Sequence, residues 1–87
     1  MSKKQLESTP DLIGEHVIMV IAGYLQRDAT KIILGSRLVE DLGADSLEIL
    51  EITLALNDYF DVEIPESELG GVRTTGDFCN LVKQLHQ

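Results

Sequence analysis

The residues best placed to do chemistry in this chain of 87 lie together between Asp41 and Glu48, in the run Asp-Leu-Gly-Ala-Asp-Ser-Leu-Glu. Asp45 and Glu48 have the spacing of a capping box, which predicts a helix that begins at Ser46. Free N–H groups and the helix macrodipole at such an end favour an attached or bound phosphate. Ser46 is therefore a candidate attachment point, and the plain alternative is that it only begins a helix.

Catalytic roles for the same residues are not supported by the sequence. A serine nucleophile needs a base, and His16 and His86 both lie far from Ser46 in the sequence. A carboxylate pair of the glycosidase kind needs a cleft, which a chain this small can hardly form. A calcium loop counted from Asp41 would need glycine at position 6, where Ser46 stands. We expect neither an enzyme nor a metal site.

The size and composition favour one small domain. With 44% hydrophobic residues the chain can form a core, and we expect a flexible segment over residues 1–8 and a single domain over residues 9–87. The single cysteine, Cys79, excludes an intramolecular disulfide and fits a reducing compartment. No signal-peptide core follows Met1, and the longest apolar run, Val17 to Ala22, is too short to span a bilayer. The expected location is the cytoplasm, without stable membrane insertion.

The negative charge is concentrated in one internal segment. The net charge is −8, yet no Lys or Arg occurs from Leu38 to Val72. The acidic residues of that segment are Glu40, Asp41, Asp45, Glu48, Glu51, Asp58, Asp61, Glu63, Glu66 and Glu68. Such charge argues against nucleic acid and anionic membranes as partners, and it attracts basic protein surfaces.

Helical periodicity and capping signals predict the elements. Thr9 as N-cap and Pro10 at the first helical position open a helix that should end near Leu25 to Asp28. A second helix should run from Ser46 to about Phe60, and a fourth should follow a capping box of Thr74 and Asp77.

Two further segments complete the expected fold. We expect one helical turn from Glu66 to Leu69, which Gly70-Gly71 ends. We expect Ile32-Ile33-Leu34 to form a loop packed on the core. The predicted fold is all-α: a small four-helix bundle with three main helices, one short third helix and a long first loop.

The helix from Ser46 to Phe60 carries two apolar stripes. On a wheel of roughly 100° per residue, one stripe is an ordinary core face, made of Ile49, Ile52, Leu56, Tyr59 and Phe60. Leu47, Leu50 and Leu54 fall on another side, with Glu51 and Asp58 beside them. Either another helix covers this second stripe, or it is a docking surface with apolar contacts at its centre and acids at its rim.

The run from Leu38 to Glu48 strongly resembles the signature of the acyl carrier protein family, in a discrete, type II-like form. The resemblance continues through Leu54-Ala55-Leu56, Phe60 to Pro65 and Thr74-Thr75, and it covers nearly the whole chain from about Asp11. It implies that a phosphopantetheinyl transferase moves 4′-phosphopantetheine from coenzyme A to Ser46, flanked by Asp45 and Leu47. The prosthetic thiol would then carry acyl groups as thioesters between enzymes of fatty-acid, polyketide or related lipid biosynthesis.

The resemblance also implies two surfaces. Acyl-transferring and condensing enzymes with basic patches would dock on Glu48, Leu50, Glu51, Leu54 and Asp58, with the carrier itself expected to be a monomer. The acyl chain would lie in an expandable core lined by Leu38, Val39, Ile49, Leu56, Ile64, Leu69 and Val72.

Some features depart from the family's usual pattern. Asn57-Asp58-Tyr59 stands where consecutive acids are common, Gly70-Gly71 replaces helix-favouring residues, and the first helix is unusually apolar. These departures favour a specialised carrier over the housekeeping one. The remaining alternatives are a D-alanyl or peptidyl carrier and an unmodified helical adaptor.

Overall fold

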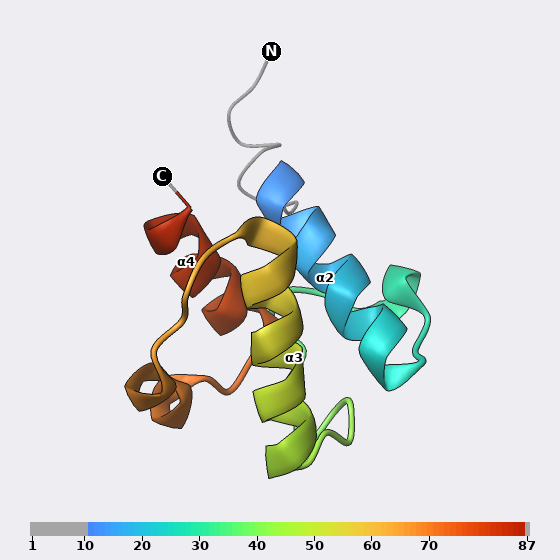
Figure 1. The fold of residues 1–87 in the computed structure, drawn as a ribbon. Helices are drawn as coiled ribbons and strands as arrows, with labels where there is room; N and C mark the ends of the chain where they lie inside the picture. The colour runs from blue at the N-terminus through green and yellow to red at the C-terminus, as the bar shows by residue number, and fades with distance from the viewer. Residues whose placement is uncertain (1–10, 87) are drawn as a thin grey trace.

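The computed structural model describes residues 11–86, in which three α-helices form the bundle (Figure 1). The elements in chain order are α2 (Leu12–Leu25), η1 (Ala29–Lys31), α3 (Ser46–Phe60), η2 (Glu66–Gly71) and α4 (Thr75–Leu85), where η1 and η2 are 3-10 helices. The described part contains no strand and a single isolated bridge, between Arg37 and Thr74. The predicted all-α fold, with three main helices, a short third helix and a long first loop, is confirmed.

The start of α2 differs from the prediction. Asp11, not Thr9, is the N-cap, because its Oδ1 atom accepts a hydrogen bond from the backbone N–H of Gly14 at 2.9 Å. The predicted positions of Thr9 and Pro10, and the predicted boundary of a flexible segment over residues 1–8, lie outside the described residues. The helix ends at Leu25, within the predicted range, and Gln26 follows it in the left-handed conformation.

The other helix boundaries follow the sequence signals more closely. The capping box of α4 is present, since the Thr74 hydroxyl accepts from the Asp77 N–H at 3.2 Å and the Asp77 carboxylate accepts from the Thr74 N–H at 3.0 Å. The predicted turn at Glu66 is the 3-10 helix η2, which runs on through Gly70 and Gly71 instead of ending before them.

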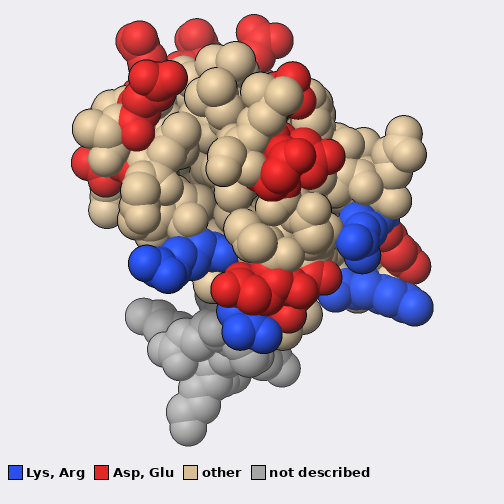
Figure 2. Space-filling view, turned by 90° about the horizontal axis from the view of Figure 1, so that it is seen from below, with Lys and Arg blue, Asp and Glu red and all other residues tan. Residues whose placement is uncertain are grey.

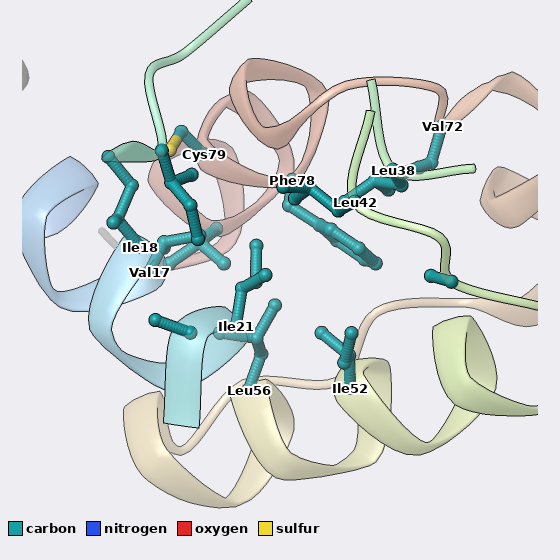
Figure 3. Packing of buried hydrophobic residues seen from close by; sticks show 14 of the residues in the cluster. Val17, Ile18, Ile21, Leu38, Leu42, Ile52, Leu56, Val72, Phe78 and Cys79 are labelled. Atoms are coloured by element: carbon teal, nitrogen blue, oxygen red, sulfur yellow. The ribbon is translucent and has the colours of Figure 1, made fainter. Parts of the chain in front are cut away.

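The core forms where α2 meets both α3 and α4. Each helix supplies fully buried side chains: Val17 and Ile21 from α2, Ile52 and Leu56 from α3, Phe78 and Val82 from α4. Figure 3 shows the Phe78 ring reaching from α4 toward α3, beside Leu38 and Leu42 of the long loop. The loop is therefore part of the core and not a surface connection, which fixes the chain that leads into α3.

The loop between α2 and α3 is also hydrogen-bonded to the start of α4. Leu38 donates from its backbone N–H to the Arg73 carbonyl at 2.9 Å, and Thr75 donates to the Ser36 carbonyl at 3.0 Å. Of the predicted loop Ile32-Ile33-Leu34, only Ile32 is buried, while Ile33 is 65% exposed. The segment does form a loop on the core, as predicted, but it contributes one side chain to it.

Candidate functional site

Ser46 is the first residue of α3, and its side chain is exposed. The predicted capping box is formed on either side of it: Asp45 accepts from the Glu48 N–H at 2.8 Å, and Glu48 accepts from the Asp45 N–H at 3.0 Å. The N–H groups of Ser46 and Leu47 have no intrahelical acceptor at this end of the helix. The site therefore offers an accessible hydroxyl beside free backbone donors.

The loop before Ser46 has a defined conformation because its backbone folds back on itself. The N–H groups of Gly43 and Ala44 donate to the carbonyls of Val39 and Leu38, at 3.0 and 2.8 Å. Gly43 has a positive φ of 73°, a region that glycine adopts without steric cost. Ala44 is 2% exposed, so the chain enters α3 anchored in the core.

An ion pair closes the beginning of this loop. The Asp41 carboxylate accepts from the Arg37 backbone N–H at 2.8 Å and from its guanidinium at 3.2 Å. The Arg37 N–H and guanidinium lower the pKa of Asp41 below its ordinary 3.8, with the backbone hydrogen bond the larger cause. Asp41 thus stabilises the loop, a role that its position in the sequence did not predict.

A second cation reaches the loop from α2. Arg27 lies just after that helix and donates from Nη2 to the carbonyl oxygen of Leu42 at 2.9 Å. The sequence contained no signal for this contact, because Arg27 and Leu42 are 15 residues apart and follow no helical spacing. Arg27 is a functional candidate that the sequence analysis missed.

The second apolar stripe of α3 is uncovered. No described element packs over it: Leu47 is 61% and Leu54 57% exposed, and Leu50 is half-buried. Asp58 is exposed beside them, and Glu51 is half-buried, where it accepts a hydrogen bond from the Tyr24 hydroxyl at 2.5 Å. The alternative that another helix covers this stripe does not hold for the described residues.

Tyr59 does not belong to the core face on which the wheel placed it. It is 55% exposed, and its hydroxyl lies 2.8 Å from Nδ1 of His16 on α2. The phenol is polar and sits near the edge of the stripe, so it bonds across the helix pair while its neighbour Phe60 enters the core.

A surface pocket of about 450 Å³ opens between α3 and η2, directly beside Ser46. Its lining consists of Ser46, Ile49, Leu50, Glu66, Leu69 and Gly70. Two predicted acyl-pocket residues, Ile49 and Leu69, are in this set. The predicted residues Leu38, Leu56, Ile64 and Val72 lie deeper, buried in the core. Val39 is 55% exposed, so the structure gives it no place in an interior lining.

The chain matches a known protein family over most of its length. The family model described as the phosphopantetheine attachment site matches residues 15–82. This chain belongs to the acyl carrier protein family. The acyl carrier protein of Clostridium acetobutylicum is 43% identical over 72 residues, covering 83% of this chain and 94% of that one. That of Campylobacter concisus is 39% identical over 73 residues, covering 84% of this chain and 95% of that one.

The solved structures agree with the sequences. A protein assigned as an acyl carrier protein from Mycobacterium tuberculosis superimposes with a TM-score of 0.78 at 30% identity, covering 83% of this chain and 96% of that chain. The relatives favour the acyl carrier over the D-alanyl or peptidyl carrier and over the unmodified adaptor. The protein is a carrier and not an enzyme, and its prosthetic group is 4′-phosphopantetheine.

The residues at the start of α3 fit this prosthetic group. Ser46 supplies an exposed hydroxyl, and the first turn has two free N–H groups of the kind that hydrogen-bond phosphate oxygens at a helix N-terminus. The pocket between α3 and η2 begins at the same residue and is lined mainly by apolar side chains. The group brings a thiol on a flexible arm, on which acyl thioesters are held.

The charge around the site is strongly negative. Figure 2 views the molecule from the end at which α3 begins, and its upper part carries Asp and Glu but no Lys or Arg. Among the described residues, two salt bridges form, Arg37–Asp41 and Lys83–Asp11. Asp41 is the one acid from the segment 38–72 that takes part, so the other acids of that segment form no salt bridge. No helix in the described range is long and apolar enough to cross a membrane.

Proposed function

We propose that Ser46 is the attachment residue and that the loaded carrier delivers acyl thioesters to enzymes that grip α3 through basic patches. The Ser46 oxygen would attack the phosphorus on the pantetheine side of the coenzyme A pyrophosphate. A new phosphodiester bond forms, adenosine 3′,5′-bisphosphate leaves, and the hydroxyl proton is released. The observation that carries this proposal is the exposed Ser46 hydroxyl at the first residue of α3, beside free backbone donors.

Intact mass spectrometry tests the attachment residue. The protein is incubated with coenzyme A and a promiscuous phosphopantetheinyl transferase, and the expected gain is the mass of one phosphopantetheine. Ser46→Ala should show no gain, while Ser67→Ala, which removes an exposed serine from η2, should load like the parent. A gain that survives Ser46→Ala, or a parent protein that never loads, contradicts the proposal.

The docking face consists of Leu47, Leu50 and Leu54 with Asp45, Glu48, Glu51 and Asp58 around them. Leu47 and Leu54 are exposed beside acids that form no salt bridge, which supports this assignment because apolar contacts supply affinity and charge supplies steering. The partners we propose are the loading transferase and acyl-transferring or condensing enzymes. Glu51→Lys should weaken transfer from such an enzyme at low salt while the thermal unfolding midpoint stays close to that of the parent. Unchanged transfer kinetics would contradict this docking face.

The acyl chain, we further propose, enters beside Ser46 through the pocket shared by α3 and η2 and reaches the core lined by Leu38, Leu56, Ile64 and Val72. The 3-10 helix η2 forms one wall of this pocket. It ends in Gly70 and Gly71, where an added Cβ would meet open space. A wall with two such residues deforms more readily than a regular helix, which fits an expandable pocket and a specialised cargo. Mass spectrometry of the carrier purified from its source would identify that cargo. If the purified carrier holds ordinary saturated fatty acyl chains of graded length, the proposal of a specialised cargo is contradicted.

The proposed location is the cytoplasm. Cys79 is the only cysteine of the chain, and it is buried as a free thiol, as expected in a reducing compartment.

A further inference from the structure

Two hydrogen bonds join α2 to α3 across their exposed seam. The Tyr24 hydroxyl donates to Glu51 Oε1 at 2.5 Å, and the Tyr59 hydroxyl lies 2.8 Å from His16 Nδ1. Tyr24 follows His16 at the same interval by which Tyr59 follows Glu51, so the two bridges share one antiparallel register. The seam thus has one bridge near the docking face and a similar one farther along.

The hydrogen bond from Tyr24 restricts the side chain of Glu51, a residue of the proposed docking face. A free glutamate samples several rotamers and loses that freedom when it pairs with a partner's cation. The Tyr24 hydroxyl occupies one oxygen of Glu51, and the other oxygen keeps its lone pairs for a further donor. The hydrogen bond therefore favours one rotamer of Glu51 before a partner arrives.

The donor stays in its protonated form at neutral pH. The hydrogen bond to Glu51, followed by loss of solvation, raises the pKa of the Tyr24 phenol above its ordinary 10.0. The Tyr24 side chain is 42% exposed, so it forms part of the surface at the point where it holds the carboxylate. The surface around Glu51 consequently includes α2 as well as α3.

We propose that Tyr24 is a positioning residue of the docking face, whose hydroxyl holds the Glu51 carboxylate ready for a Lys or Arg side chain of the partner enzyme. The inference rests on the docking face proposed above and adds α2 to it. A partner that fits this site contacts both helices, with its cation at Glu51 and its neighbouring surface against the Tyr24 ring.

Loading kinetics test this role with the phosphopantetheinyl transferase and coenzyme A as the probe. Tyr24→Phe keeps the ring and removes the donor. We expect KM for the carrier to rise about two- to tenfold, the range set by ordering one long side chain. The value of kcat should stay within error, because Tyr24 does not touch the reacting atoms, and the thermal midpoint of the variant checks that it folds.

Two further variants separate positioning from general packing. Tyr59→Phe removes the matching hydroxyl from the second bridge, which leaves Glu51 untouched, so KM should equal that of the parent. In a Glu51→Gln background, Tyr24→Phe should raise KM no further, because a positioning effect needs the carboxylate.

These measurements distinguish a failure of the proposed function from a failure of the inference about Tyr24. If the parent does not load at Ser46, the proposed function fails. If Glu51→Gln leaves KM unchanged, the docking role of Glu51 fails, and this inference fails with it. If Glu51→Gln raises KM and Tyr24→Phe does not, only the inference is wrong. A lower KM for Tyr24→Phe would also overturn it, since the hydroxyl would then compete with the partner's cation.

Discussion

Arg27, just after α2, and Leu42, just before Gly43, are joined by a hydrogen bond of 2.9 Å from the guanidinium Nη2 to the carbonyl oxygen. The bond spans the long first loop and holds the chain four residues before Ser46 against the end of α2. The segment of chain that leads to Ser46 is thus held by Arg27 at one point and by the Arg37–Asp41 ion pair at another.

Arg27→Met removes the hydrogen bond to Leu42 and keeps most of the side-chain length, so the segment before Ser46 should be held less firmly. We expect a loss of about 1 kcal/mol in the free energy of unfolding, typical of a partly exposed hydrogen bond to a charged group. The kcat/KM for loading of Ser46 should fall by less than about tenfold, which that energy allows. Urea unfolding and loading kinetics measure the two effects.

Lys31→Met is the matched control for Arg27. Lys31 lines the same surface pocket as Arg27, and in the described structure it makes no side-chain hydrogen bond to the loop. This variant should load and unfold like the parent. Equal effects from both substitutions would show that the charge of the pocket matters and the hydrogen bond does not.

Gly43→Ala should destabilise the protein by about 1–2 kcal/mol, the cost of a side chain in the left-handed region. The positive φ of 73° is the cause, and an added Cβ would also stand 3.3 Å from Arg27 Nη2. Gly70→Ala is the control variant. Gly70 has ordinary backbone angles, and an added Cβ there would meet open space. That variant should be neutral or more stable by up to about 1 kcal/mol. Urea unfolding compares them, and equal losses at both positions would contradict the argument.

Acid should destabilise the start of α4. The backbone N–H groups of Arg73 and Thr74 hydrogen-bond to Asp77 at 2.8 and 3.0 Å, and the Arg73 contact is the main cause that lowers the pKa of Asp77 below 3.8. A carboxyl whose pKa is lower in the folded state contributes its full stability above about pH 4 and loses it as the pH falls through the folded value. The free energy of unfolding, measured from pH 7 downward, should therefore fall below about pH 4. Asp77→Asn should make that fall shallower, and an identical slope would contradict this assignment.

Cys79 should be unreactive in the folded carrier. The thiol is buried on α4, and burial raises its pKa to about 11, so very little thiolate exists at neutral pH. A disulfide reagent at pH 7 should count no fast thiol in the unloaded protein and one in the loaded protein, from the prosthetic arm. A fast thiol in the unloaded protein that disappears in Cys79→Ser would contradict this prediction.

The features that could be predicted correctly from the residues alone are mostly local. The bounds of α3, the capping boxes at Asp45 and Thr74 and the place of Ser46 all follow from side chains three or four residues apart, which set a helix end before any tertiary contact forms. The concentration of acids between Leu38 and Val72 is likewise a property of composition.

The tertiary structure decided which residues support those features. The contacts Arg27–Leu42 and Tyr24–Glu51 join segments with no shared periodicity, so no pattern in the sequence could pair them. The contact of Tyr59 with His16 and the exposure of Val39 likewise depend on how these segments pack. Local spacing placed the hydroxyl at the head of a helix, but only the packing of α2 against α3 determined which side chains hold the loop and the acids around it.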